Sequence, residues 1–377
     1  MARHKQAGTF GTIGQKQRQY PVGTRILIVA IDSVGDKRPQ LPAGRIQVRR
    51  DKLPLDLVVS ITRRTASSMT AIVEDTYAEA FRSVYVEFLI TARDLKWVQH
   101  AANATVGNAS STIMCDCEAG IDRLIGPGTD YPESTPDGRP GAIVQLHIPR
   151  FRKDRISALE KSALTRISQN VLTAPTAACF NRIDADHFFQ MGRKVAYFGD
   201  GFQQRIDRHG RKMWWIPTLG GEFILDRRLG YRDGLMGGNL WFFGRSQDAA
   251  LDAAERGVTA VNDVPGVITT FPGGIAGSGS KAGSRYSFSI ASTYEKYCPQ
   301  LRDHPQAACE LPAGVESVME IIINGESLES LERATQAAIE AAVETPGLLR
   351  ISAGNYGGKL GKSFIFLKPK SRELLGT

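Results

Sequence analysis

The sequence predicts an α+β fold in which one run of strands and helices occurs twice. Three observations indicate this fold. Apolar, strand-like runs alternate with amphipathic helical patterns from residue 69 onward, each half of this region gives the order βαβ–βαβ, and matching segments recur roughly 150 residues apart. That order is typical of helices on one face of an antiparallel sheet, the ferredoxin-like arrangement. We therefore expect two ferredoxin-like lobes from an internal duplication.

The first half begins with a strand over 84–92 (VYVEFLITA). The helical pattern after it has three apolar residues on one face, namely Leu95, Val98 and Ala102. The run 111–122 is apolar and ends in a small-residue turn, and 141–148 (GAIVQLHI) predicts another strand. Apolar residues then return at helical spacing, at Ile156, Leu159, Ala163 and Ile167.

The second half repeats this series. A strand is expected over 239–246 (NLWFFGRS), where Ser246 is a good helix cap. The following helical face carries Ala250, Leu251, Ala254 and Val258. The run 267–281 ends in a small-residue turn, and 318–325 (VMEIIING) predicts a strand before a final helix that stops at Thr345-Pro346-Gly347. We place the first lobe and a connecting segment at 69–235, and the second lobe and C-terminal segment at 236–377.

The net charge of +8 comes entirely from the start of the chain. Residues 1–68 hold 13 Lys and Arg against 4 Asp and Glu, whereas 69–377 hold 34 against 35. The body therefore has no electrostatic excess with which to hold phosphates, and a nucleic-acid partner is not expected. We interpret 1–68 as a basic N-terminal extension, either a mobile arm or sequence upstream of the true start.

Cysteine usage and apolar runs indicate the compartment. The five cysteines are few, odd in number and dispersed, which suits reduced thiols in a cytoplasm. The longest apolar stretches, such as 26–31, fall short of the roughly 20 residues that a membrane span needs, and no secretory signal is evident. We expect a cytoplasmic protein with no membrane partner.

Glu320 is an unusual residue for the apolar strand 318–325. Burying an isolated charge in such surroundings costs several kcal/mol, because the charge loses its contact with water. Either the carboxylate pairs with an arginine or reaches solvent at a strand end, or it is a partly buried acid with a raised pKa that serves as a general acid or base. The residues alone leave both interpretations open.

Two glycine-rich turns are candidates for ligand contact. In 271–284 (FPGGIAGSGSKAGS), small residues let a ligand approach backbone amides closely. The spacing resembles a phosphate loop, but Ser280-Lys281 stands where Lys-Ser or Lys-Thr is required. In 357–363 (GGKLGKS), Tyr356 replaces the required first glycine. Neither is a nucleotide site, and plain flexible turns remain the alternative.

Other chemistry has little support. Cys115 and Cys117 lack a second ligand pair, and the six histidines are scattered, so no metal site is expected. A G-x-S-x-G elbow and an obvious Ser/His/Asp set are absent. A hydrolase is disfavoured because no residues that would activate a water molecule are evident. Trp214 and Trp215 could wall a site for a flat ring or simply pack at an interface.

The chain resembles the formylmethanofuran–tetrahydromethanopterin formyltransferase family. The resemblance spans residues 69 to about 366 and rests on EDTYAEAF, CEAGID, TPDGRPG, TAPTA, YFGDG, GEFI, FPGGI, ASTYEKYCP, EIIING and ISAGNYGGKLG. It implies a two-lobed protomer, a homotetramer, and formyl transfer between the amine nitrogen of methanofuran and N5 of tetrahydromethanopterin. These two carbon carriers are substrates, and no prosthetic group or metal is implied.

The resemblance places the family's proposed catalytic glutamate on Glu320. Motif and physical suitability suggest further substrate-binding residues, which are Pro272, Gly273, Gly274, Ser278, Ser280, Lys281, Asn355 and Gly357. A carboxyl group kept neutral by its apolar strand can donate a proton to one nitrogen and recover it from the other.

The resemblance also bears on the biological setting. Bacterial relatives work within a formyltransferase/hydrolase complex, and the balanced composition favours that setting, in which formaldehyde is oxidised to formate. The alternative is a structural subunit of such a complex without activity.

Overall fold

The computed structural model describes residues 70–126 and 135–368, so the predicted N-terminal extension 1–68 lies outside the described residues. The α-helices of the described part are α1 (Leu95–Val106), α2 (Arg155–Arg166), α3 (Met191–Ala196), α4 (Gln247–Asn262) and α5 (Leu328–Ala342). The strands are β1 (Ile72–Val73), β2 (Tyr77–Thr91), β3 (Glu118–Ile125), β4 (Gly141–Pro149), β5 (Ala178–Asn181), β6 (Phe188–Phe189), β7 (Gln204–Arg208), β8 (Arg211–Thr218), β9 (Gly221–Asp226), β10 (Leu229–Gly244), β11 (Val267–Thr269), β12 (Ile275–Ala276), β13 (Lys281–Ala282), β14 (Ala291–Ser292), β15 (Ser317–Gly325), β16 (Leu348–Ala353) and β17 (Ser363–Phe366).

The two halves have the same strand order. In the first lobe β5, β2, β4 and β3 lie side by side and antiparallel, with α1 and α2 packed on one face. In the second lobe β16, β10, β15 and β11 take the corresponding places, covered by α4 and α5. In both lobes the fourth, first, third and second strands of the lobe lie side by side in that order across the sheet, which is the ferredoxin-like arrangement. The predicted α+β class with two such lobes is confirmed, while the duplication itself stays a prediction.

Local chemistry starts the helices where the sequence indicates. Asp94 accepts from the Trp97 backbone N–H at 3.1 Å and caps α1. Ser246, the predicted cap, accepts from the Ala249 N–H at 3.1 Å and begins α4. Ser327 begins α5 with a reciprocal capping box. Each cap satisfies an amide that the first helical turn leaves without a partner.

Strand alternation separates a helix-covered face from an opposite face in the second lobe. Leu240 and Phe242 of β10 belong to the core under α4 and α5. Trp241 and Phe243, between and beside them, join a different cluster with Leu311 on the other face. Side chains of a strand point alternately to the two faces. The segments that follow β11 therefore cover the face of the sheet opposite α4 and α5.

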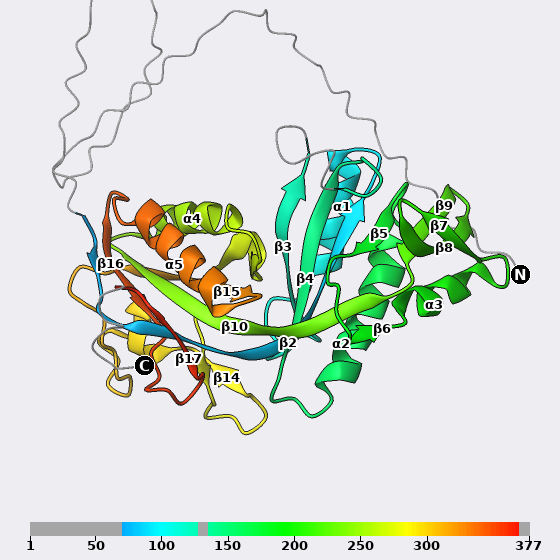
Figure 1. The fold of residues 1–377 in the computed structure, drawn as a ribbon. Helices are drawn as coiled ribbons and strands as arrows, with labels where there is room; N and C mark the ends of the chain where they lie inside the picture. The colour runs from blue at the N-terminus through cyan, green and yellow to red at the C-terminus, as the bar shows by residue number, and fades with distance from the viewer. Residues whose placement is uncertain (1–69, 127–134, 369–377) are drawn as a thin grey trace, which may run out of the picture. The chain divides into compact units, whose positions relative to one another are not determined.

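Two long strands join the lobes. β2 has 15 residues and β10 has 16, against a typical strand of about 5 or 6. The two pair with each other over Tyr231–Met236 and Phe81–Val86, so each enters both lobes (Figure 1). The start of β2 pairs with β17, whose Ile365 lies in the core of the second lobe. β10 crosses the predicted boundary between residues 235 and 236, and these boundaries stay a prediction.

The connecting segment is built largely of strands. β7, β8 and β9 form an antiparallel meander that extends the first-lobe sheet through a parallel β5–β9 pair. Trp214 packs on the core under α1 and α2, and Trp215 packs on the opposite side. The Trp215 indole N–H donates to Glu222 at 2.5 Å. Both tryptophans thus pack within this sheet.

The lobes also meet through β3 and β11. A Cβ on Gly120 would lie 2.5 Å from the Thr269 carbonyl oxygen, so only glycine lets the two strands approach this closely. Nearby, the Gly266 N–H donates to Asp122 at 3.2 Å, and burial raises the pKa of that carboxyl group to about 7. None of the described helices has the length and apolar character of a membrane span.

Candidate active site

Glu320 lies in the middle of β15, on the face opposite α4 and α5. It stands across from Trp241 of β10 and Ala276 of β12, and it is 8% exposed. Its neighbour Ile321 points the other way, into the helix-covered core. Because side chains of a strand alternate between its two faces, Glu320 points away from the core that Ile321 enters.

A cavity of about 100 Å³ opens beside the Glu320 carboxyl group. Its lining joins β10, β15, the turn after β12 and the segment after β14, with Trp241, Ala276, Gly277, Ser278, Gly279, Thr293, Tyr294, Tyr297, Cys298, Pro299, Val318 and Glu320. Gly277 and Ser278 are exposed, so this wall lies at the surface.

The surroundings of Glu320 favour its neutral form. Burial raises the pKa of the carboxyl group, while hydrogen bonds with Asn239 and Trp241 act in the opposite direction. The Asn239 amide donates to Glu320 Oε1 at 2.7 Å. In the described part of the chain its partners are therefore an amide and an indole. Among the described ion pairs none includes Glu320, and its burial raises the pKa against the effect of the two donors, so burial supports the interpretation as a protonatable acid.

Aromatic rings form much of the cavity wall. The Trp241 ring lies 5.6 Å from that of Tyr294 and 4.9 Å from that of Tyr297, measured between centroids. Burial raises the pKa of both phenols, so they stay neutral donors. The wall therefore offers apolar ring surface together with phenol hydroxyl groups that can form hydrogen bonds.

The predicted turn 271–284 divides at β12. Ser278 lies on the cavity wall, and Ser280 and Lys281 follow it without lining the cavity. Lys281 instead forms an ion pair with Glu295 and is held in β13.

The earlier part of this turn has a structural function. Pro272, Gly273 and Gly274 form a short 3₁₀ turn, η3 (Pro272–Gly274), at the other end of β12. A Cβ on Gly274 would lie 2.7 Å from the Thr269 hydroxyl. The structure therefore brings Ser278, and not this turn, next to Glu320.

The second predicted turn, with Asn355 and Gly357, follows β16. Asn355 is exposed, and its Oδ1 accepts from the Gly357 N–H at 3.0 Å. Neither residue lines the cavity. The turn wraps around the buried carboxylate of Glu79 on β2, which accepts from backbone N–H groups of Tyr356, Gly358, Leu360 and Gly361 at 2.6–3.0 Å.

Glu79 explains why 357–363 looks like a phosphate loop. Successive amides of a glycine-rich turn form an anion site, and here the anion is the protein's own carboxylate. Burial opposes ionisation of Glu79, yet the four amides lower its pKa overall. The amides of this turn are therefore already bound by a side chain of the same protein.

Several residues beside Glu320 were not predicted. Asn239 begins the run NLWFFGRS. A polar residue directly before four apolar or aromatic residues of a strand could have indicated a buried polar contact. Tyr294 and Tyr297 lie in the quoted motif ASTYEKYCP, but nothing in their spacing indicates a cavity.

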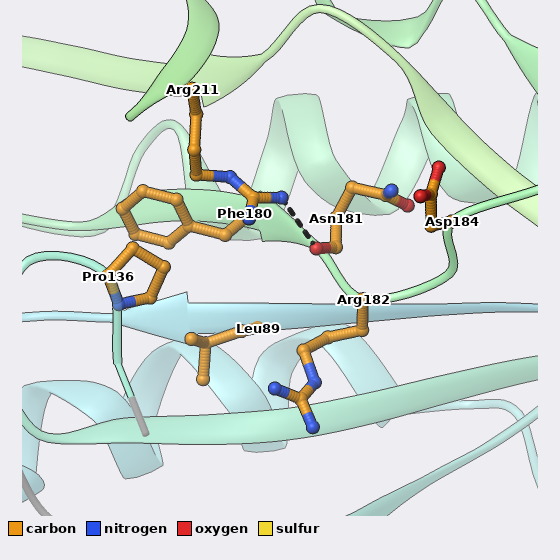
Figure 2. A pocket seen from close by; sticks show the side chains of 7 residues that line it. All are labelled: Leu89, Pro136, Phe180, Asn181, Arg182, Asp184 and Arg211. Atoms are coloured by element: carbon orange, nitrogen blue, oxygen red, sulfur yellow. Dashed lines mark hydrogen bonds between the residues drawn. The ribbon is translucent and has the colours of Figure 1, made fainter. Parts of the chain in front are cut away.

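A larger cavity of about 390 Å³ lies in the first lobe (Figure 2). Both Arg211 and Arg182 line it, and Figure 2 shows the Arg211 side chain beside Phe180 and the Arg182 guanidinium farther from that ring, on the side of Leu89. Arg211 donates to the Asn181 carbonyl at 2.9 Å and is paired with Asp226. The cavity contains none of the predicted site residues. Among the described residues, no group of three or more His, Cys, Asp or Glu could hold a metal ion.

Comparison with known proteins identifies the family. The family model described as formylmethanofuran-tetrahydromethanopterin formyltransferase matches residues 67–218, and the model of its proximal lobe matches 221–369. A relative named formylmethanofuran–tetrahydromethanopterin formyltransferase, from Archaeoglobus fulgidus, is 44% identical over 78% of this chain and 96% of its own length. The chain belongs to this formyltransferase family. The predicted resemblance is confirmed.

Other members of the formyltransferase family agree. The relative of that name from Methanosarcina acetivorans is 46% identical over 77% of this chain and 95% of its own length. The solved formyltransferase from Methanosarcina barkeri superposes with a TM-score of 0.74 at 44% identity, covering 79% of this chain and 97% of that one. A chain of the formyltransferase/hydrolase complex from Methylorubrum extorquens, solved with methylofuran, gives a TM-score of 0.71 at 38% identity, covering 80% and 96%.

Proposed function

We propose that this chain transfers a formyl group between methanofuran, or an analogue of it, and N5 of tetrahydromethanopterin. The observation that carries the proposal is the position of Glu320, a buried acid on the wall of an aromatic cavity in a chain of the formyltransferase family. The two carbon carriers are substrates, and the chain's own side chains supply the acid and base.

Glu320 manages the protons in this proposal. Attack of one nitrogen on the formyl carbon gives a tetrahedral oxyanion, and expulsion of the other nitrogen requires a proton. A neutral Glu320 donates that proton to the leaving nitrogen and recovers one from the attacking nitrogen, so the acid is restored. With both substrates bound together, orientation supplies much of the rate, and no covalent enzyme intermediate is required.

Ser278 and its neighbouring amides are the proposed oxyanion donors. Gly277, Ser278 and Gly279 line the cavity together with the aromatic rings, and small side chains let a ligand approach their N–H groups. The roles of Pro272, Gly273, Gly274, Ser280, Lys281, Asn355 and Gly357 are indirect in this proposal, because these residues shape the turns beside β12 and after β16 and do not line the cavity.

We extend the proposal to assembly and setting. The family resemblance supports a homotetramer, and the similarity to a chain of the Methylorubrum extorquens complex supports association with hydrolase subunits. That setting favours formaldehyde oxidation to formate as the physiological direction. The described cysteines are all free thiols, which suits the cytoplasm.

The test is an assay of formyl transfer with the purified full-length chain. Formylmethanofuran and tetrahydromethanopterin are mixed with enzyme, and the absorbance change of the formylated pterin is followed. We expect transfer that depends on both substrates. A folded, tetrameric chain that gives no transfer overturns the proposed activity and leaves the structural-subunit alternative.

A further inference from the structure

Asn239 occupies the central strand of the second lobe, beside Glu320. On β10 it stands across from Ile322 of β15, so it is a diagonal neighbour of Glu320 on the same face. The side chain is 6% exposed. Its Nδ2 donates to Glu320 Oε1 at 2.7 Å, and its Oδ1 accepts from the Gly354 backbone N–H at 2.8 Å.

The amide of Asn239 can be oriented in only one way. A backbone N–H is always a donor, so the oxygen of the amide must face Gly354 and its NH₂ group must face Glu320. Glu320 Oε1 is thereby held as an acceptor. When the carboxyl group is neutral, its proton therefore resides on Oε2. The Trp241 indole is the other donor to this carboxyl group, and because an indole has no acceptor it does not compete for that proton.

The surroundings prevent Asn239 from turning away. A Cβ on Gly354 would lie 2.5 Å from Asn239 Oδ1, so the backbone packs directly on the amide. The Tyr356 phenol is hydrogen-bonded to the Asn239 side chain, and its backbone N–H is held by Glu79 at 2.6 Å. The internally occupied turn thus supports the amide from behind.

We infer that Asn239 is a positioning residue that fixes Glu320 with Oε1 committed and Oε2 presenting the transferable proton. The inference rests on the proposed formyl transfer for its consequence, but the orientation itself does not. Loss of the amide donor has two effects. The carboxylate loses a stabilising hydrogen bond, which raises its pKa, and the proton is no longer confined to one oxygen.

The test exchanges the donor for an acceptor without changing the shape of the side chain. Asn239→Asp keeps an oxygen for the Gly354 N–H but opposes Glu320 with a second carboxyl group. Asn324→Asp is the matched control, because Asn324 likewise donates to a buried glutamate, Glu118 at 2.7 Å, and accepts from the Gly237 N–H at 2.9 Å. Asn324 does not line the cavity.

Two measurements separate this inference from the proposed activity. The first is the pH dependence of kcat. We expect Asn239→Asp to lower kcat by about 10- to 100-fold, with little change in KM, and to move the ionisation that limits kcat to higher pH. Asn324→Asp should keep the wild-type pH profile. If the pH profile of Asn239→Asp coincides with the profiles of the wild type and of Asn324→Asp, the inference is overturned.

The second measurement needs no turnover. Glutamate carboxyl carbons are labelled with ¹³C, the Glu320 resonance is assigned from its absence in Glu320→Gln, and its titration is compared between wild type and Asn239→Asp. Because a second carboxyl group by itself raises the pKa of Glu320, the uncharged and similarly shaped Asn239→Leu is titrated as well. An upward shift in both variants supports the positioning function even if the chain transfers no formyl group, in which case only the proposed activity fails. An unshifted titration overturns the inference even in an active enzyme.

Discussion

The Asn324 side chain donates to the Glu118 carboxylate at 2.7 Å, although the two residues stand 206 positions apart in the chain. Glu118 begins β3 of the first lobe and Asn324 is near the end of β15 of the second. Both are buried, so this hydrogen bond joins the lobes inside the protein rather than at its surface. Burial raises the pKa of the Glu118 carboxyl group. A buried polar group without a hydrogen-bond partner costs free energy, so the Asn324 donor contributes to stability.

Replacement of Asn324 by Ala should destabilise the whole fold. It leaves Glu118 Oε2 without its amide donor and the Gly237 N–H without its acceptor, which costs about 1–3 kcal/mol for an unsatisfied buried group. Urea denaturation measures the change in the free energy of unfolding. Asn262→Ala, at an exposed position, is the control and should change it by about 0.5 kcal/mol or less. Equal stability of the two variants would contradict a structural role for this bond.

Glu320→Gln should abolish most activity while preserving the fold. The amide keeps an oxygen to accept from Asn239 but cannot give up a proton, so kcat should fall by about 10²- to 10⁴-fold, the usual contribution of a general acid. Steady-state kinetics and a thermal melt check both parts. The exposed Glu316→Gln serves as the matched charge control and should retain wild-type kinetics. Undiminished transfer by Glu320→Gln would remove Glu320 from the mechanism.

Asp122 should make the protein less stable as pH rises. Its pKa is about 7 in the folded chain because of burial, against an ordinary value of 3.8, so the folded state binds the proton more tightly than the unfolded state. Stability from this group is therefore present at low pH and is lost between about pH 4 and pH 7. Asp122→Asn should stabilise the protein by about 1–3 kcal/mol more at pH 8 than at pH 5, relative to wild type. Urea unfolding at both pH values gives this difference, and a difference of zero would refute the assignment.

Glu79→Gln should loosen the turn after β16. The carboxylate accepts four amides with two oxygens, whereas glutamine offers one acceptor oxygen, so part of the turn loses its partner. Hydrogen exchange followed by mass spectrometry should show faster exchange in peptides covering 354–362 and unchanged exchange in α5. Because the four amides lower the Glu79 pKa, wild type should approach the variant's exchange only as pH falls through that lowered pKa. Unaltered exchange across 354–362 would mean that Glu79 does not organise the turn.

Local patterns predicted the lobes well because periodicity is a property of neighbouring residues. Ser246 as a cap and the strand 318–325 were both visible from residues close in the chain. The start of β2 was not, since the strand begins at Tyr77 rather than 84. Ala78 and Glu79 have low strand propensity, and pairing with β17 overrides it.

The candidate site was predictable only in part, because its contacts join distant residues. Glu320 was evident as a carboxyl group in an apolar run, and Ser278 as part of a small-residue turn. Asn239 lies 81 residues from Glu320, and the register that makes them neighbours exists only in the folded sheet. The turn 357–363 resembled a phosphate loop without matching its motif, and the anion that its amides hold is a carboxylate 277 or more residues away.

The shared strands make the two lobes interdependent. The turn between β8 and β9 carries Leu219 fully exposed, which makes it a natural place to cut the backbone. Cleavage there would give one fragment that holds β2 without β10 and β17, and another that holds β10 and β17 without β2. Each would display a bare sheet edge that only the other can cover. The fragments should therefore reassemble as an obligate pair, and the intact chain should melt in a single cooperative step.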